Sequence, residues 1–234
     1  MKPKVAILPS ALFSALSCAV SCALAAALLA FATAPAAAHP HVWVTAKVEI
    51  AYADGKVAAV RNVWTFDAAY TAFVTQGLDA NKDGKLTPDE LQTLATENTG
   101  NLAEFGYFTK LKVGGKEQAF ADPVEPRMAM EGDSLTLSFR LPLKTPPSQG
   151  RGVLALEVYD PTYFVSFGLS AAPDAATLAG APAGCAATVT RPKTPEPKTA
   201  EAGSPGMSEA FFEALTAASG YGVQFANRVL VACP

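Results

Sequence analysis

Twelve residues, Asp79 to Glu90, constrain this chain more than any other stretch. They read Asp-Ala-Asn-Lys-Asp-Gly-Lys-Leu-Thr-Pro-Asp-Glu. Oxygen-bearing groups at alternate positions and a closing carboxylate suit a calcium ion, which takes six to eight hard oxygen ligands. Gly84 stands at the sixth position, where the chain must bend sharply. The expected ligands are Asp79, Asn81, Asp83, the carbonyl of Lys85, Thr87 through a water, and both carboxylate oxygens of Glu90.

This spacing fits the EF-hand loop pattern D-x-[DN]-x-[DN]-G-x5-E at every required position. Apolar residues recur at helical spacing in residues 66–74 before the loop and again from Leu91 to Phe105 after it. We therefore expect an EF-hand-like helix-loop-helix inserted at about residues 67–105. The alternative is a polar turn between two helices that binds no ion. Because sensor EF-hands usually work in pairs and no second loop is present, calcium is expected to be structural here.

The first 38 residues have the features of a secretory signal. A charged start, Met1 to Lys4, precedes a long apolar run that ends in Ala36-Ala37-Ala38, an A-x-A cleavage site. We expect cleavage after Ala38 and a periplasmic location; an uncleaved membrane anchor is the alternative. No later run is long enough to cross a bilayer, so no stable membrane insertion is expected after cleavage.

The remaining residues, 39–234, are enough for a single domain with a substantial core. Removing the signal takes two of the 18 lysines and arginines and none of the 21 acidic residues, so the mature net charge is −5. A mildly acidic domain is a poor candidate for binding nucleic acid. Cys185 and Cys233 remain, and an even pair in an exported protein indicates a disulfide.

The mature chain begins with a predicted β-hairpin. Apolar residues alternate with polar ones over residues 42–52, the pattern of a half-buried strand. Asp54-Gly55 is a strong signal for a two-residue turn, and residues 57–66 form the returning strand.

A two-residue turn sets a register in which Thr45 faces Trp64 and Trp43 faces Phe66. A β-bulge would shift these pairs by one residue. Asp67 follows the second strand and is expected to cap the first helix.

The rest of the chain favours strands joined by tight turns. We predict an α+β fold: mainly an antiparallel β sheet or sandwich, with the inserted EF-hand-like helix-loop-helix and a short C-terminal helix. The expected later strands are residues 107–113, 116–120, 124–130, 134–143, 153–159, 163–169, 185–191 and 229–233, with a loop over 171–184 and the C-terminal helix over 208–218.

His39 and His41 are the only histidines in the chain, and both fall at the predicted mature terminus. A free terminal amine and two imidazoles suit nickel, cobalt, zinc or copper. Pro40 has no amide proton, which blocks a chelate built on successive deprotonated backbone amides. Asp67 is the nearest candidate third ligand and Asp160 a weaker one. The alternative is an ordered strand start whose histidines hydrogen-bond to a neighbouring strand.

Several groups of residues recur in a recognisable order: His39-Pro40-His41-Val42-Trp43, Trp64-Thr65-Phe66-Asp67, the loop 79–90, Tyr159-Asp160-Pro161-Thr162-Tyr163-Phe164, and Gln224-Phe225-Ala226-Asn227 with Cys233. On these motifs the mature chain resembles an uncharacterised bacterial periplasmic family, a domain of unknown function whose members are often labelled the periplasmic component of an ABC-type transport system. The resemblance implies export and an association with nickel/cobalt-type permeases.

These observations predict a periplasmic metal-binding accessory protein that works with an inner-membrane metal transporter. The alternative is a calcium-stabilised binding or scaffold domain without a transition-metal role. A copper redox enzyme is a third hypothesis. No enzyme is expected: a catalytic triad would have to use a histidine at the very terminus. Paired-carboxylate chemistry is left open, because the sequence does not show which carboxylates lie close in space. The aromatic residues Trp64, Phe66, Tyr159, Tyr163 and Phe164 are candidates either for a pocket lining or for plain core packing.

Overall fold

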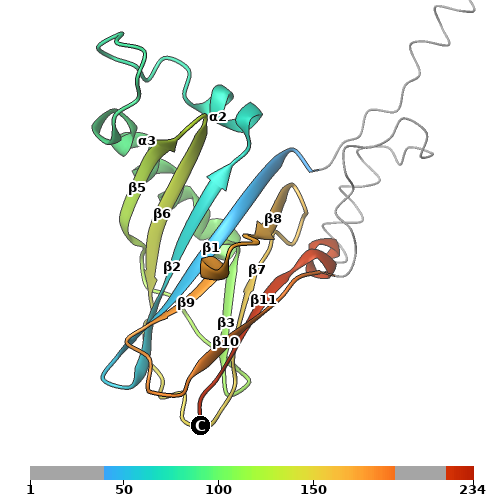
Figure 1. Cartoon of the computed structure of the whole chain (residues 1–234). Helices are drawn as coiled ribbons and strands as arrows, with labels where there is room; N and C mark the ends of the chain where they lie inside the picture. The colour runs from blue at the N-terminus through green and yellow to red at the C-terminus, as the bar shows by residue number, and fades with distance from the viewer. Residues whose placement is uncertain (1–39, 193–219) are drawn as a thin grey trace, which may run out of the picture. The chain divides into compact units, whose positions relative to one another are not determined.

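The computed structural model describes residues 40–192 and 220–234. Its strands are β1 (Val42–Ala53), β2 (Lys56–Phe66), β3 (Thr109–Val113), β4 (Lys116–Glu117), β5 (Val124–Glu131), β6 (Ser134–Pro142), β7 (Leu154–Val158), β8 (Val165–Leu169), β9 (Ala176–Ala179), β10 (Ala186–Thr190) and β11 (Asn227–Ala232). Within these residues they form two sheets (Figure 1). Sheet 1 has the order β5-β6-β2-β1-β8, with β9 also paired to β1, and sheet 2 has the order β10-β11-β7-β3-β4.

The two sheets share one hydrophobic core, as a sandwich does. Every second residue of β1, from Val42 to Tyr52, is buried. Side chains of sheet 2, including Leu111, Leu156 and Val229, belong to the same buried cluster. The prediction of a sheet-rich α+β fold is therefore confirmed.

The β1–β2 hairpin turns at Asp54-Gly55 as predicted. Both residues have positive φ, 51° and 72°, as a type I′ turn requires. Next to the turn Ala53 pairs with Lys56, but the register shifts between Ala51 and Tyr52. The bulge that the sequence allowed is therefore present.

Because of this bulge, the predicted pairs are wrong by one residue. Thr45 faces Thr65 rather than Trp64, and Phe66 faces Val44 rather than Trp43. The physical cause is a change of phase in β2, where burial moves from odd to even positions across Ala59 and Val60. The bulge keeps apolar side chains on the core face on both sides of that change.

Sheet 1 is not purely antiparallel, because β1 runs parallel to both β8 and β9. The first half of β1 pairs with β8 and the second half with β9. The expected loop over residues 171–184 thus contains a short strand. Strand β9 satisfies backbone groups of β1 beyond the end of β8.

Two helices and a 3-10 segment lie between β2 and β3: α2 (Ala68–Val74), α3 (Pro88–Asn101) and η1 (Leu102–Phe108). Asp67 caps α2 as predicted, accepting from the N–H of Tyr70 at 2.9 Å. In α3, Leu91, Ala95 and Thr99 recur every four residues and are buried, and the helix packs against β5. A helical insertion at the predicted place is therefore present.

The predicted disulfide is confirmed between Cys185 and Cys233. These cysteines flank the paired residues Ala186 and Ala232, so the bond closes the end of the β10–β11 ladder. Two further 3-10 turns are η2 (Pro173–Ala175) and η3 (Tyr221–Phe225). The predicted signal, residues 1–38, and the predicted helix 208–218 lie outside the described residues. Within the described ranges, no helix is long and apolar enough to cross a membrane.

Candidate functional site

The loop between α2 and α3 is closed by its own acidic side chains. Asp79 accepts hydrogen bonds from the backbone N–H of Asp83 at 3.1 Å and of Gly84 at 2.9 Å. Asn81 Oδ1 accepts from the same N–H of Asp83 at 2.9 Å. Gly84 has a φ of 78°, the left-handed conformation that glycine adopts without strain. The predicted bend at this position is thus observed.

Glu90 ties the beginning of this loop to its end. One carboxylate oxygen accepts from the N–H of Ala80 at 3.0 Å, and the other accepts from the N–H and the hydroxyl of Thr87, each at 2.9 Å. Thr87 is also the N-cap of α3, so the pair forms a capping box. The hydrogen bonds from Thr87, with a smaller contribution from Ala80, hold the pKa of the Glu90 carboxyl below its usual range.

The side-chain oxygens of the loop accept hydrogen bonds from backbone N–H groups; they do not converge on a common centre as metal ligands would. Asp79 and Glu90 are half-buried, whereas Asn81, Asp83, Lys85 and Thr87 are exposed. In the ranges 40–192 and 220–234, no three His, Cys, Asp or Glu side chains form a cluster suited to holding a metal. The calcium ligands therefore remain a prediction.

Of the two predicted histidine ligands, His39 lies outside the described residues and His41 is exposed at the start of β1. The N–H of His41 donates to the carbonyl of Phe164 at 2.9 Å, and its ring stacks on the Phe164 ring with centroids 4.6 Å apart. Both carboxylate oxygens of Asp67 accept backbone N–H groups, from Trp43 and Tyr70. Asp67 is therefore observed as a helix cap.

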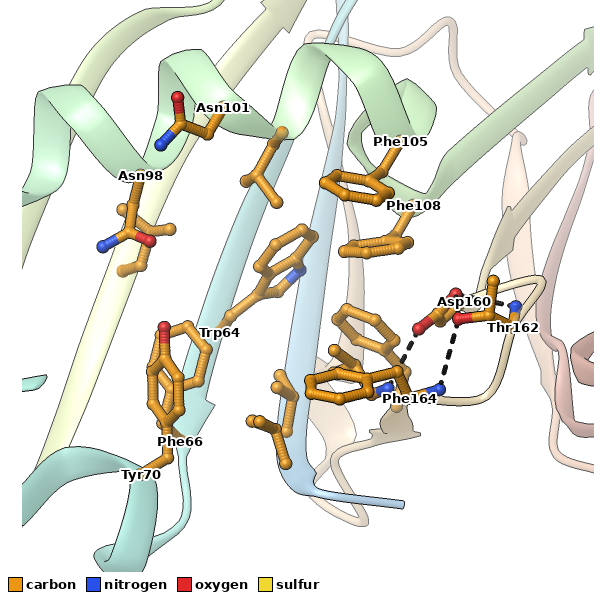
Figure 2. Close-up of a pocket in the computed structure, with 16 residues that line it drawn as sticks. Trp64, Phe66, Tyr70, Asn98, Asn101, Phe105, Phe108, Asp160, Thr162 and Phe164 are labelled. Carbon is orange, nitrogen blue, oxygen red and sulfur yellow. Dashed lines mark hydrogen bonds between the residues drawn. The ribbon is translucent and has the colours of Figure 1, made fainter. Parts of the chain in front are cut away.

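A cavity of about 480 Å³ lies between the inner face of sheet 1, the end of α3 with η1, and the loop that leads into β8. Aromatic rings dominate its walls (Figure 2). Its lining is Val42, Val44, Trp64, Phe66, Tyr70, Asn98, Asn101, Leu102, Phe105, Phe108, Leu137, Asp160, Thr162, Phe164, Val165 and Phe167. We call this cavity the aromatic pocket.

Ring pairs shape the aromatic pocket. Phe105 and Phe108 stack with centroids 5.5 Å apart, and Phe66 lies 4.7 Å from Tyr70. Figure 2 shows Trp64 between these two pairs. Its ring is buried, and its indole nitrogen has no hydrogen-bond partner among the described residues.

The aromatic residues named from the sequence divide into two groups. Trp64, Phe66 and Phe164 line the aromatic pocket. Tyr159 lines a separate, smaller cleft, and Tyr163 stacks on Phe225 at 3.9 Å. The polar residues at the pocket rim, Asn98 and Asn101, were not predicted, because only the fold brings the end of α3 to this place.

Asp160, the weaker candidate ligand, holds its own loop together. One oxygen accepts from the N–H and the hydroxyl of Thr162, each at 2.8 Å, and the other accepts from the N–H of Val165 at 2.9 Å. The carboxylate is buried and sits at the edge of the aromatic pocket (Figure 2). It orders the loop that leads into β8.

The fold and these sites define a class: a disulfide-bonded two-sheet domain with a helical insertion and an aromatic pocket. The chain belongs to the family described as "Protein of unknown function (DUF1007)", whose model matches residues 24–233. It is 23% identical over 205 residues to an uncharacterized protein of Haemophilus influenzae, covering 87% of this chain and 95% of the relative. No solved structure matches.

Proposed function

We propose that this protein is an exported, non-catalytic metal-binding accessory domain that holds a structural calcium ion in the loop 79–90 and assists a metal transporter of the inner membrane. The observation that carries the proposal is the order of oxygen donors in that loop, placed between two helices. The transition-metal part rests on His39 and His41 at the predicted mature terminus.

The donor set of the loop fits calcium. Asp79, Asn81, Asp83 and Glu90 carry hard oxygens, which this ion prefers. The backbone already bends at Gly84, and Glu90 already bridges the two ends of the loop. Small side-chain rotations would turn the carboxylates away from the backbone N–H groups and toward an ion. The backbone conformation of the loop would not need to change.

Calcium in this loop would brace α2 against α3. Asp67 couples the start of α2 to the start of β1 through the N–H of Trp43. An ion in the loop that follows α2 would therefore stabilise the insertion whose first helix also holds the histidine end of β1. In this role calcium is structural, which suits the weak affinities of extracellular modules.

Thermal melting of the purified protein with and without calcium tests this part. With a Kd near 10⁻⁴ M, 10 mM calcium should stabilise the fold by about 2.7 kcal/mol. A rise of roughly 5–10 °C in the melting temperature is expected for a chain of this size. Glu90→Gln should lose most of the rise, while Glu97→Gln, an exposed acid of α3, should keep it. If the melting temperature of the wild-type protein did not change with calcium, the calcium assignment would be wrong.

A second candidate is a calcium-stabilised scaffold domain without a transition-metal role. It is favoured by the contact of the His41 ring with Phe164. Mass spectrometry of the mature N-terminus, followed by titration with nickel, cobalt, zinc and copper, separates the two. The first proposal expects a start at His39 and at least a tenfold loss of affinity in His39→Ala/His41→Ala. If the double variant binds the transition metals as tightly as the wild type does, the scaffold domain is the better account.

A further inference from the structure

The aromatic pocket contains a buried carboxylate that no described Lys, Arg or His side chain pairs with. Asp160 is 4% exposed and lines the pocket. Among the described residues it makes no ion pair, and its three hydrogen bonds come from Thr162 and the N–H of Val165. A buried carboxylate normally has a charged partner or a metal. Among the described residues that line the pocket, Asp160 is the only charged one; His41 lies behind the wall, stacked on Phe164.

The end of α3 adds to the negative charge of Asp160. Asn98, Asn101 and Leu102, which line the pocket, lie at the C-terminal end of the helix. The last turn of α3 holds no basic residue. The C-terminal end of a helix carries partial negative charge, and a cation placed there is stabilised.

The walls of the aromatic pocket are formed largely by aromatic rings. Trp64, Phe66, Tyr70, Phe105, Phe108 and Phe164 all line it. Ring faces attract organic cations, and aromatic enclosures that recognise alkylated ammonium groups use this attraction. The remaining wall residues are largely aliphatic, so an apolar body is accommodated as well.

The loop that carries Asp160 is held in place by contacts with η3. The N–H of Gly222 donates to the carbonyl of Pro161 at 2.9 Å, and Tyr163 stacks on Phe225 at 3.9 Å. A Cβ added at Gly222 would lie 1.8 Å from the carbonyl oxygen of Asp160, so only glycine permits this approach. The carboxylate is therefore held in place before any ligand arrives, which reduces the entropy lost on binding.

Three of the six described non-glycine residues with positive φ lie near the pocket. Tyr107 and Phe108 have φ of 55° and 47° at the corner between η1 and β3, and Tyr163 has φ of 60° in the loop after Asp160. Such conformations cost about 1–3 kcal/mol each for non-glycine residues and cluster at ligand sites. Phe108 and the loop that contains Asp160, Thr162 and Phe164 both line the cavity.

We propose that the aromatic pocket binds a small organic cation with an apolar body, of the alkylammonium class, with its charge beside Asp160 and the end of α3. This site shares no residue with the loop 79–90. It borders the histidine end, because the His41 ring stacks on the wall residue Phe164, but His41 itself does not line it. None of the proposed calcium ligands and no described histidine lines the pocket, so binding of the cation is tested without any metal present.

Three probes that share one alkyl chain test the charge preference: octyltrimethylammonium, octan-1-ol and octanoate. Isothermal titration of the purified protein should give at least tenfold tighter binding of the cation than of either other probe. Asp160→Asn should weaken the cation about tenfold and leave octan-1-ol unchanged. Equal binding of the three probes, or no binding of the cation at millimolar concentration, would overturn the proposal.

Two further variants keep the test decisive if Asp160→Asn does not fold. Asn101→Lys places a positive charge at the pocket rim and should reverse the preference from the cation to octanoate. Phe105→Ala should weaken the cation several-fold, while Phe73→Ala, the matched change at an exposed phenylalanine of α2 outside the pocket, should have no effect. An unchanged preference in Asn101→Lys, or equal effects of the two Phe→Ala changes, would contradict a cation site here.

Discussion

The carboxylate of Asp67 accepts a hydrogen bond from the backbone N–H of Trp43 at 2.8 Å, and so joins the start of β1 to the N-terminus of α2. Asp67→Ala removes the helix cap and the strand contact together. We expect the free energy of unfolding to fall by about 1–2 kcal/mol, because a lost N-cap alone costs about 1 kcal/mol. Urea denaturation measures the change. Asp67→Asn, which retains one acceptor oxygen, should lose less, and equal losses would contradict the double role.

Glu90 gives the insertion a dependence on acid. Hydrogen bonds from Thr87 favour the ionised form, so the folded-state pKa lies below the ordinary value of 4.5. A lowered pKa contributes stability that is complete above the ordinary value and is lost as the pH falls through the folded-state value. As the pH is lowered from 7 to 3, the melting temperature of the wild type should decrease more steeply than that of Glu90→Gln. Parallel profiles would contradict this role of Glu90.

Trp64 is nearly inaccessible, at 2% exposed, and packs edge-on against Phe139 and Phe167. Trp64→Ala should cost about 3–5 kcal/mol of unfolding free energy, because it leaves a large cavity. Trp64→Phe should cost about 1 kcal/mol, since it removes less volume and also a buried N–H without a partner. Trp43→Phe, at an exposed site, is the control and should cost less than about 0.5 kcal/mol. Equal costs at the two positions would show that Trp64 is not a core residue.

The Cys185–Cys233 bond closes a long loop that ends at β11. Its sequence separation of 48 residues corresponds to about 4 kcal/mol in the chain-entropy estimate. Cys185→Ser/Cys233→Ser should lose about this much stability. Dithiothreitol should lower the stability of the wild type by a similar amount and leave the double variant unchanged. A double variant as stable as the oxidised wild type would contradict the estimate.

Local signals predicted much of the fold. The alternation over 42–52, the Asp54-Gly55 turn and the cap at Asp67 are each determined by a few neighbouring residues, and each is observed. The sequence did not settle whether a bulge is present, because the turn alone sets only the first pairs; the bulge lies at Ala58 of β2, opposite the Ala51–Tyr52 step. Strand β9 was missed, since its Ala-rich segment becomes a strand only by pairing with the free edge of β1.

The two candidate sites differ in how much of each could be predicted from the sequence. The loop 79–90 is contiguous, so its donor order is visible in the sequence, although the gathering of those donors around an ion remains a prediction. The aromatic pocket joins Trp64 of β2, Phe105 of η1 and Asp160 of the loop before β8. No local pattern brings these three residues together, because their proximity depends on the packing of the two sheets and the insertion.

Calcium titration by calorimetry tests the central claim most directly. We predict one calcium ion bound per chain, with affinity at least tenfold weaker in Glu90→Gln and in Asp79→Asn and unchanged in Glu97→Gln. No heat of binding at 10 mM calcium, or undiminished binding in both loop variants, would contradict the account.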